Sequence, residues 1–222
     1  MNYINIKRFF DFIAGIIVLI SLSPLFILIM TLLKFSAEGE VFYIQERFGK
    51  SNKKFFIWKF ATMLKNSMNL GTGSITLRND FRVTKIGKVL RKTKINELPQ
   101  IINIIKGDIS FVGPRPLVQK DFDAYPFKIK KIIYDIKPGL TGIGSIVFRD
   151  EELLISDNKG DNPHLYYKSV IAPYKGDLEI WYQKNISFFV DLKLIFLTAW
   201  VVFFPKSKLY RSLFKNLPER NF

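Results

Sequence analysis

Residues 91–116 read RKTKINELPQIINIIKGDISFVGPRP, and this stretch carries the clearest structural pattern of the chain. Asn96 is a suitable helix N-cap, because its side-chain oxygen can accept a hydrogen bond from a free backbone N–H. Pro99 falls in the first turn, where a proline costs no hydrogen bond. Apolar residues then recur at spacings of three and four up to Gly107, which predicts a helix with one apolar face and a glycine stop. We therefore expect a helix whose positive N-terminal end lies beside Glu97.

Two charged residues of this stretch are suited to phosphate chemistry. Glu97 stands at the expected helix end, where a carboxylate can be ionised and where phosphate is also attracted. Residues 110–112 read as a short strand, and Arg115 follows between two prolines, so that its planar guanidinium can be held for two hydrogen bonds to a diphosphate. The pattern alone leaves a simpler alternative open, in which Asn96 is only a cap, Glu97 only a dipole partner and Arg115 only a surface charge.

The composition of the chain indicates an anionic partner at a membrane. Its formal net charge of +15 suits nucleic acid, a phospholipid surface or a phosphorylated substrate equally well. The hydrophobic content of 48% and aromatic content of 15% favour a membrane interface, and no nucleic-acid-binding motif is present in the sequence. The absence of cysteine excludes disulfides and thiol chemistry and is compatible with a reducing cytosolic face.

Residues 12–33 carry no charge and are long enough for a membrane-spanning helix. However, Ser23 and Pro24 interrupt this segment, and each half then covers only about 15–18 Å, against roughly 30 Å of hydrocarbon. Basic residues flank both ends, with Lys7 and Arg8 on the N-terminal side. A broken helix that returns to the same side would keep both flanks inside, whereas a single span would not. The residues alone leave both arrangements open.

Several further segments have clear local patterns. Residues 41–46 and 55–63 are aromatic and β-branched and predict a β-hairpin. Lys59, on the second strand, is either a phosphate contact or a solvated strand lysine. Residues 80–92 predict a basic amphipathic helix that can lie on anionic lipid. Residues 179–204 are strongly apolar, but the charges inside this segment divide it into shorter helices packed in the core or against the membrane.

The order of these motifs resembles that of the bacterial sugar transferases, a family of monotopic phosphoglycosyl transferases. The central family motif runs Asp-Glu-Leu-Pro-Gln, then Gly-Asp-Met-Ser, then Val-Gly-Pro-Arg-Pro, and residues 96–116 of this chain follow it closely. Further matches cover nearly the whole chain: Lys7-Arg8 with Asp11, Ser23-Pro24, Gln45-Glu46-Arg47 with Gly49, Lys59-Phe60 with Thr62-Met63, Asp80 with Arg82, Thr84 and Gly87, Lys137-Pro138-Gly139-Leu140-Thr141-Gly142, and Asn185-Ile186-Ser187 with Asp191-Leu192.

The resemblance implies a fold and a location. The fold class would be α+β and mainly helical, with a re-entrant membrane helix, a small β-hairpin and interfacial amphipathic helices. Residues 1–36 would enter one leaflet of the membrane, and residues 37–222 would form a cytosolic, membrane-associated transferase domain. The protein would lie on the cytoplasmic face of the bacterial inner membrane.

The resemblance also implies an activity: transfer of a phospho-sugar from a UDP-sugar to undecaprenyl phosphate, with release of UMP, in a surface glycan pathway. Both substrates are polyanionic, which suits a basic site with Mg²⁺. Family members act through a covalent aspartyl-phosphosugar intermediate. The expected partners are the UDP-sugar, undecaprenyl phosphate and the phospholipid membrane, with no nucleic acid, and a homodimer is a further option.

The family motifs assign roles to individual residues. Glu97 and Asn96 occupy the catalytic positions, and Glu97 would also bind the metal ion. Lys7, Arg8, Ser23 and Pro24 belong to the membrane segment. The expected substrate-binding residues are Lys59, Arg115, Lys137, Gly139, Thr141, Gly142 and Arg149, with the glycines allowing close approach of the backbone to a ligand.

The chain departs from the family pattern at the catalytic position itself. Asn96 stands where the resemblance requires the nucleophilic aspartate, and an amide cannot form an acyl phosphate in the same way. Three explanations follow: Glu97 is the nucleophile, a later acid such as Asp150 or Glu151 enters the site, or the chain is a membrane-bound pseudoenzyme or a partner of a sister transferase. We favour Glu97, because it places a carboxylate at the same helix end. Ala61 also replaces a usual cation of the family.

Overall fold

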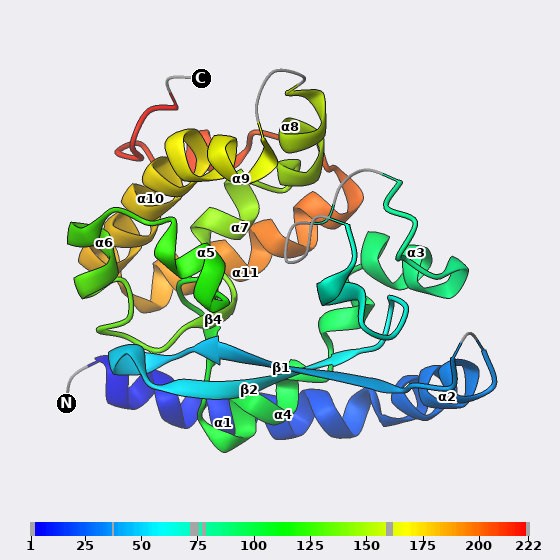
Figure 1. Cartoon of the computed structure of the whole chain (residues 1–222). Helices are drawn as coiled ribbons and strands as arrows, with labels where there is room; N and C mark the ends of the chain where they lie inside the picture. Colours follow the sequence, from blue (N-terminus) through cyan, green and yellow to red (C-terminus); the bar gives the residue numbers. More distant parts are fainter. Residues whose placement is uncertain (1–2, 37, 72–75, 77–78, 159–161, 221–222) are drawn as a thin grey trace.

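A computed structural model describes residues 3–36, 38–71, 76, 79–158 and 162–220. This part of the chain is mainly helical, with two small pairs of strands (Figure 1). The elements in chain order are α1 (Tyr3–Ser21), α2 (Ser23–Lys34), β1 (Phe42–Phe48), η1 (Lys50–Asn52), β2 (Lys54–Phe60), η2 (Ser67–Asn69), α3 (Lys85–Lys92), η3 (Ile95–Glu97), α4 (Gln100–Lys106), β3 (Ser110–Val112), α5 (Gln119–Asp123), α6 (Phe127–Ile132), β4 (Gly139–Thr141), α7 (Ile143–Val147), α8 (Glu151–Asp157), α9 (Pro163–Tyr166), η4 (Tyr167–Ile171), α10 (Ala172–Asn185), α11 (Phe188–Phe203) and α12 (Tyr210–Leu213).

The N-terminal apolar segment is broken where the sequence predicts. Helices α1 and α2 meet at an angle of 62°. Pro24 lies in the first turn of α2, where it cannot donate a hydrogen bond back into α1, and the Ser23 hydroxyl donates to the Ile20 carbonyl at 2.8 Å instead. In the described part of the chain no single helix has the length and apolar character to cross a bilayer, and this bent pair reaches that length and composition only when its two helices are taken together.

The predicted hairpin is present and is fastened to α4. Strands β1 and β2 pair antiparallel over their full length. Asn103 of α4 is fully buried, and its side chain donates to the Phe56 carbonyl at 2.7 Å and accepts from the Trp58 N–H at 3.0 Å. This double contact fixes the end of β2, and with it Lys59, against the first turn of α4.

The helix expected after Asn96 forms, but Asn96 does not cap it. Helix α4 begins at Gln100, and Asn96 lies in the preceding 3₁₀ turn η3, with no side-chain cap hydrogen bond. The N–H groups of Leu98 and Ile101 donate to the carbonyls of Ile95 and Leu98, each at 3.0 Å. The capping prediction is therefore wrong, because short backbone turns already satisfy the donors that an N-cap would serve.

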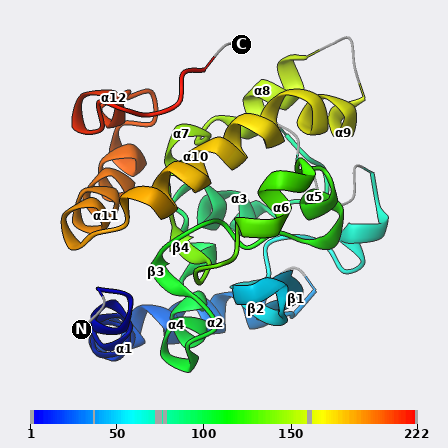
Figure 2. The ribbon, with the colours of Figure 1, turned by 90° about the vertical axis from the view of Figure 1, so that its left-hand side faces the viewer.

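Two apolar clusters hold these elements together. The smaller one joins α2 to β2, α3 and α4, so the N-terminal helices share a core with the rest of the chain. The larger one lies among α5, α6, α7, α10 and α11, and in Figure 2 α5 and α6 lie above the hairpin. The division expected within residues 179–204 is present in part: α10 ends at Asn185, just after Lys184, and α11 begins at Phe188, but Asp191 and Lys193 lie within the continuous helix α11 and do not divide it. Residues 80–92 contribute a shorter helix than expected, α3, which begins after the capping residue Thr84.

Candidate active site

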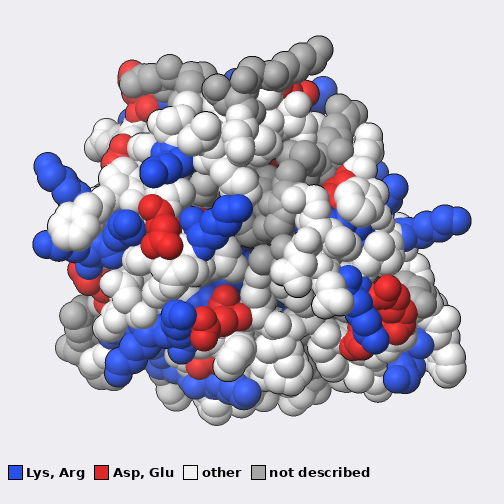
Figure 3. Space-filling model, in the orientation of Figure 1, with Lys and Arg blue, Asp and Glu red and all other residues white. Residues whose placement is uncertain are grey.

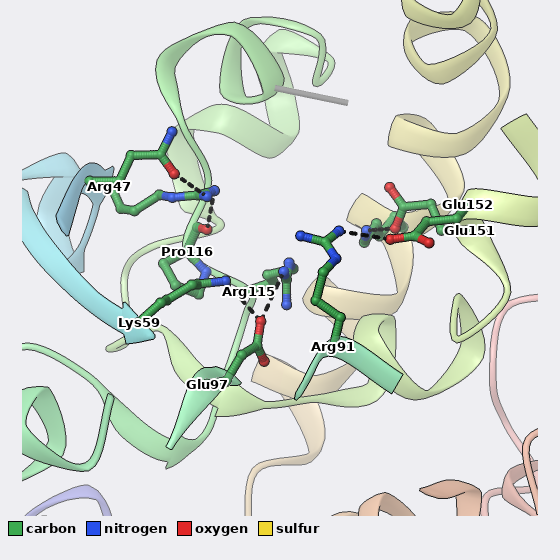
Figure 4. Close-up of polar contacts among 10 residues, drawn as sticks. Arg47, Lys59, Arg91, Glu97, Arg115, Pro116, Glu151 and Glu152 are labelled. Atoms are coloured by element: carbon green, nitrogen blue, oxygen red, sulfur yellow. Dashed lines mark hydrogen bonds and ion pairs between the residues drawn. The ribbon is translucent and has the colours of Figure 1, made fainter. Parts of the chain in front are cut away.

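Three segments distant in sequence bring charged side chains together at Glu97 (Figure 4). The turn η3 supplies Glu97, strand β2 supplies Lys59, and the loop after β3 supplies Arg115. The Lys59 ammonium lies 2.8 Å from Glu97 Oε1, and the Arg115 guanidinium lies 3.5 Å from the same oxygen. The structure therefore unites the three residues that the sequence assigned to catalysis and diphosphate binding.

The carboxylate of Glu97 is ionised in this setting. Its side chain is 12% exposed, and that burial alone would raise its pKa. The positive charges of Lys59, Arg115 and Lys94 outweigh the burial and hold the pKa of Glu97 well below its ordinary value. Burial, followed by repulsion from Arg115 and Arg47, lowers the pKa of Lys59 to about 7 despite the attraction of Glu97. The site thus holds a charged carboxylate beside a lysine that titrates near neutrality.

Other cations surround this group. Burial lowers the pKa values of Lys94 and Arg149, and the charge of Glu97 opposes both shifts, so both lie near the carboxylate. The Arg47 guanidinium donates to Gln45 Oε1 at 2.6 Å and to the Pro116 carbonyl at 3.3 Å. Lys59, Arg115, Lys94 and Arg149 all lie near Glu97, so their positive charge exceeds the negative charge of this carboxylate, which favours binding of a polyanion.

The sequence predicted Arg149 but missed Lys94 and Arg47 as members of this cluster. Lys94 has a left-handed backbone conformation, with φ of 62°, directly before η3. Its position in the basic run at residues 91–94, immediately before the central motif, was the available signal. Arg47 belongs to a quoted family motif, but only the tertiary structure shows that its charge faces Arg115.

Asn96 is buried beside Glu97 without a partner for its side-chain oxygen. The residue is 7% exposed, and within the described residues no donor reaches Oδ1. Leaving a buried acceptor unsatisfied costs about 1–3 kcal/mol, so such atoms call for an explanation. A donor group on a bound ligand would satisfy this oxygen.

The glycines expected to contact a ligand lie close to the protein backbone. A Cβ placed on Gly139 would lie 2.1 Å from the Gly113 nitrogen, and one on Gly142 would lie 2.3 Å from the Gly113 oxygen. Only glycine permits these approaches. They hold the loop that carries Arg115 in place, and ligand contact by the two glycines stays a prediction.

Two other predicted substrate residues lie outside the contacts at Glu97. The Thr141 hydroxyl lies 2.6 Å from the Thr198 hydroxyl of α11. Lys137 lines a cavity together with Lys7 and Arg8. The structure therefore divides the predicted binding residues into two groups, with Lys59, Arg115 and Arg149 in one and Lys137 in the other.

The basic residues of the N-terminal motif have partners inside the protein. The Lys7 ammonium lies 2.5 Å from Asp191 of α11. The Arg8 guanidinium donates to the carbonyls of Ile104 and Ile105, at 2.7 and 2.8 Å, and so caps the C-terminal end of α4. These two residues join α1 to α11 and α4, whatever contact they make with lipid.

The alternative acids lie near the same site. Glu151, at the start of α8, pairs with Lys175 at 2.5 Å, and its charge contributes to raising the pKa of Arg115. Glu152 pairs with Arg91 at 3.0 Å (Figure 4). Asp150 directly precedes α8. Among the candidate acids in the described ranges, only Glu97 contacts both Lys59 and Arg115.

A divalent metal ion would find one suitable carboxylate here. The described residues contain no group of three or more acidic, histidine or cysteine side chains that could hold a metal by themselves. Mg²⁺ commonly takes only one or two protein carboxylates and completes its shell with water and substrate phosphates. Both cation contacts of Glu97 are to Oε1. Glu97 therefore fits Mg²⁺ as a single ligand beside bound phosphates.

Comparison with known proteins places the chain in a family. The sequence profile of the bacterial sugar transferases matches residues 2–205. Exopolysaccharide production protein ExoY of Rhizobium meliloti is 35% identical over 206 residues, which cover 86% of this chain and 83% of that protein. The chain belongs to the bacterial sugar transferase family.

Relatives with named substrates are longer than this chain. A UDP-N-acetylgalactosamine-undecaprenyl-phosphate N-acetylgalactosaminephosphotransferase of Aeromonas hydrophila is 34% identical over 199 residues, covering 88% of this chain and 43% of that protein. A UDP-glucose:undecaprenyl-phosphate glucose-1-phosphate transferase of Klebsiella pneumoniae is 34% identical over 211 residues, covering 93% and 42%. The chain thus spans less than half the length of these two relatives.

Proposed function

We propose that this protein transfers a sugar phosphate from a UDP-sugar to undecaprenyl phosphate and releases UMP. The observation that carries the proposal is the ionised Glu97 carboxylate held between Lys59 and Arg115. Membership of the bacterial sugar transferase family and the names of the relatives supply the substrate classes. The surrounding cations suit a diphosphate, and the exposed apolar helices suit a lipid acceptor.

The proposed reaction has two displacements at one phosphorus. A Glu97 oxygen attacks the phosphorus that carries the sugar, and the bond from that phosphorus to the bridging oxygen breaks. UMP leaves with the bridging oxygen and its electron pair, and Glu97 becomes an acyl phosphate. An oxygen of undecaprenyl phosphate then attacks the same phosphorus, which restores the carboxylate and leaves a lipid diphosphate sugar. Lys59 and Arg115 stabilise the negative charge on the phosphoryl oxygens in both steps.

Asn96 has a binding role in this scheme. Its amide cannot replace the aspartate of the family as nucleophile, but its unpartnered Oδ1 can accept a hydrogen bond from a sugar hydroxyl. Mg²⁺, when bound by Glu97 and the substrate phosphates, would neutralise charge on the diphosphate. We propose that α1 and α2 enter one leaflet of the cytoplasmic membrane and return to the same side. Neither helix passes as a membrane span by itself, and the bend between them prevents the pair from forming one straight helix.

The test is UMP release from a panel of UDP-sugars with undecaprenyl phosphate and Mg²⁺. Lipid-dependent UMP release by the unaltered chain is the expected result. Omission of Mg²⁺ should lower the rate of UMP release. If chelator-treated protein releases UMP at the same rate with and without added Mg²⁺, the ion has no part in the reaction.

A second candidate rests on Asn96 itself. A chain that binds both ligands without turnover would keep the cation cluster and lose the nucleophile. UDP binding without UMP release from any UDP-sugar, together with activity in Asn96→Asp, would identify such a pseudoenzyme.

A further inference from the structure

A second basic site lies at the N-terminal end of α1, on the side of the hairpin turn. It is a cavity of about 240 Å³ whose charged lining is Lys7, Arg8, Asp11, Lys50 and Lys137. We call it the basic cavity. Figure 3 shows Lys and Arg side chains gathered at the lower left of the molecule, over the hairpin turn and the start of α1.

Three of these charged groups are already engaged. Lys7 pairs with Asp191, and the Arg8 guanidinium serves two carbonyls at the end of α4. The Asp11 carboxylate accepts from the Ser110 hydroxyl at 2.6 Å and from the Phe111 N–H at 3.3 Å. The charges of Asp11 and Asp108 still attract Lys137, but neither carboxylate makes an ion pair with Lys50 or Lys137 among the described residues.

The ammonium groups of Lys50 and Lys137 have no hydrogen bond or ion pair to the described residues. The fold keeps Lys50 and Lys137 near each other. The Ser51 N–H donates to the Tyr134 carbonyl at 2.7 Å and so holds the hairpin turn beside the segment that leads to Lys137. Burial, then the charges of Arg8 and Lys50, lower the pKa of Lys137. An anion between the two ammonium groups would relieve this repulsion.

An apolar groove continues from the basic cavity. This second cavity, of about 120 Å³, lies between α1 and α11 and shares Lys7, Asp11 and Val112 with the first. Its apolar lining includes Phe10, Phe188, Leu192 and Ile195. Large side chains beside it stay exposed, with Phe9 at 63% and Phe189 at 73%. A polar cavity that opens into an apolar groove on an exposed apolar face suits a lipid with a charged head.

We propose that the basic cavity binds the phosphate of an acidic phospholipid between Lys50 and Lys137, with an acyl chain along the apolar groove. The lipid is not the acceptor, because neither cavity is lined by Lys59, Glu97 or Arg115. A phosphate held there would not meet the reacting carboxylate. The bound phospholipid instead fixes α1 against α11 and so sets the depth of the transferase at the membrane. This site is independent of the proposed reaction.

Native mass spectrometry of the full chain in detergent tests this proposal. The protein is titrated with dioleoyl phosphatidylglycerol, and the variants are the double substitution Lys50→Gln with Lys137→Gln and the control Lys53→Gln. Lys53 lies exposed in the same hairpin turn and lines neither cavity. We expect one saturable phosphatidylglycerol adduct, at least tenfold weaker in the double variant and unchanged in the control, and weaker binding of zwitterionic phosphatidylcholine.

Two outcomes would overturn the proposal. Equal phosphatidylglycerol affinity in the double variant and the unaltered chain would show that the basic cavity is not the site. Displacement of phosphatidylglycerol by equimolar undecaprenyl phosphate, with the double variant weakening both lipids alike, would assign the cavity to the acceptor. Retention of the phosphatidylglycerol adduct in the presence of undecaprenyl phosphate supports a separate phospholipid site.

Discussion

The Glu97 site and the basic cavity use cations differently. At Glu97, Lys59 and Arg115 contact one carboxylate oxygen, and their charge keeps that carboxylate ionised despite burial. In the basic cavity, the ammonium groups of Lys50 and Lys137 contact no carboxylate among the described residues, and the nearby Asp11 is occupied by Ser110.

This difference assigns a different proposed role to each site: the Glu97 site carries out the reaction, and the basic cavity retains a lipid. A carboxylate held ionised among cations can attack a phosphorus atom whose charge the same cations stabilise. Lys50 and Lys137 have no carboxylate in contact with them among the described residues, so we expect them to hold a phosphate without presenting it to a nucleophile. Substitutions in the first site should therefore change turnover, whereas those in the second should change lipid retention.

The largest expected effect is on Glu97→Gln. The amide preserves the shape of the side chain but cannot form an acyl phosphate, so UMP release should fall on the order of 10³-fold or more. Glu219→Gln, on the exposed C-terminal segment, is the matched control and should retain its rate. Asn96→Asp should retain or raise activity. Full activity in Glu97→Gln together with loss in Glu151→Gln or Asp150→Asn would move the role to the later acids.

The next effect is expected for Arg115→Lys. A single ammonium cannot reproduce two parallel hydrogen bonds to a diphosphate, so kcat/KM should fall by an amount equivalent to about 1.5–3 kcal/mol. Arg211→Lys, on the exposed face of α12, controls for the general loss of a guanidinium. Unchanged turnover and UDP affinity in Arg115→Lys would reduce Arg115 to a structural role.

A smaller effect concerns pH and Lys59. The pKa of Lys59 is lowered to about 7, so in the free protein its ammonium is present below that pH and lost above it. UDP affinity, measured by calorimetry, should weaken by up to about tenfold per pH unit as the pH rises above 7. Arginine stays charged over this pH range, so Lys59→Arg should remove the part of the pH dependence that comes from Lys59. The titration of UDP itself affects both proteins equally and cancels in the comparison. Identical pH profiles in the two proteins would show that Lys59 does not titrate in the binding step.

The last prediction concerns placement rather than rate, and it tests whether the basic cavity can face the membrane surface. The chain has no cysteine, so Asn5→Cys and Ser212→Cys provide single labels near the start of α1 and in α12. Both should be protected from an impermeant thiol reagent in intact cells and react after permeabilisation. Pro24→Leu should straighten the pair toward a spanning helix and expose position 5. Labelling of Asn5→Cys from outside in the otherwise unaltered chain would exclude the re-entrant arrangement.

Local patterns predicted the features that depend on local structure. The break at Pro24 and the hairpin follow from proline geometry and strand-forming residues, and both are present. The family motifs predicted that Lys59, Glu97 and Arg115 would serve one site, and the structure brings them into contact. The break and the hairpin are confirmed because each rests on few residues, whereas the roles of Lys59, Glu97 and Arg115 stay predictions.

Features that depend on tertiary packing were missed. Asn96 was expected to cap α4, but backbone hydrogen bonds in η3 made that cap unnecessary. The close approach of Gly139 to Gly113 could not be read from the sequence, and contact of Gly139 with a ligand stays a prediction. Lys137 was expected to bind substrate, which stays a prediction, and only the structure shows that its side chain lines the basic cavity. Sequence spacing does not report which way a loop side chain turns.

The most direct test of the central claim is peptide mass spectrometry after incubation with a UDP-sugar in the absence of lipid. We expect a sugar-phosphate adduct on the peptide that contains Glu97, formed together with UMP, absent in Glu97→Gln and removed by undecaprenyl phosphate. An adduct on the peptide that contains Glu151, or lipid-dependent UMP release with no adduct in any peptide, would contradict Glu97 as the nucleophile.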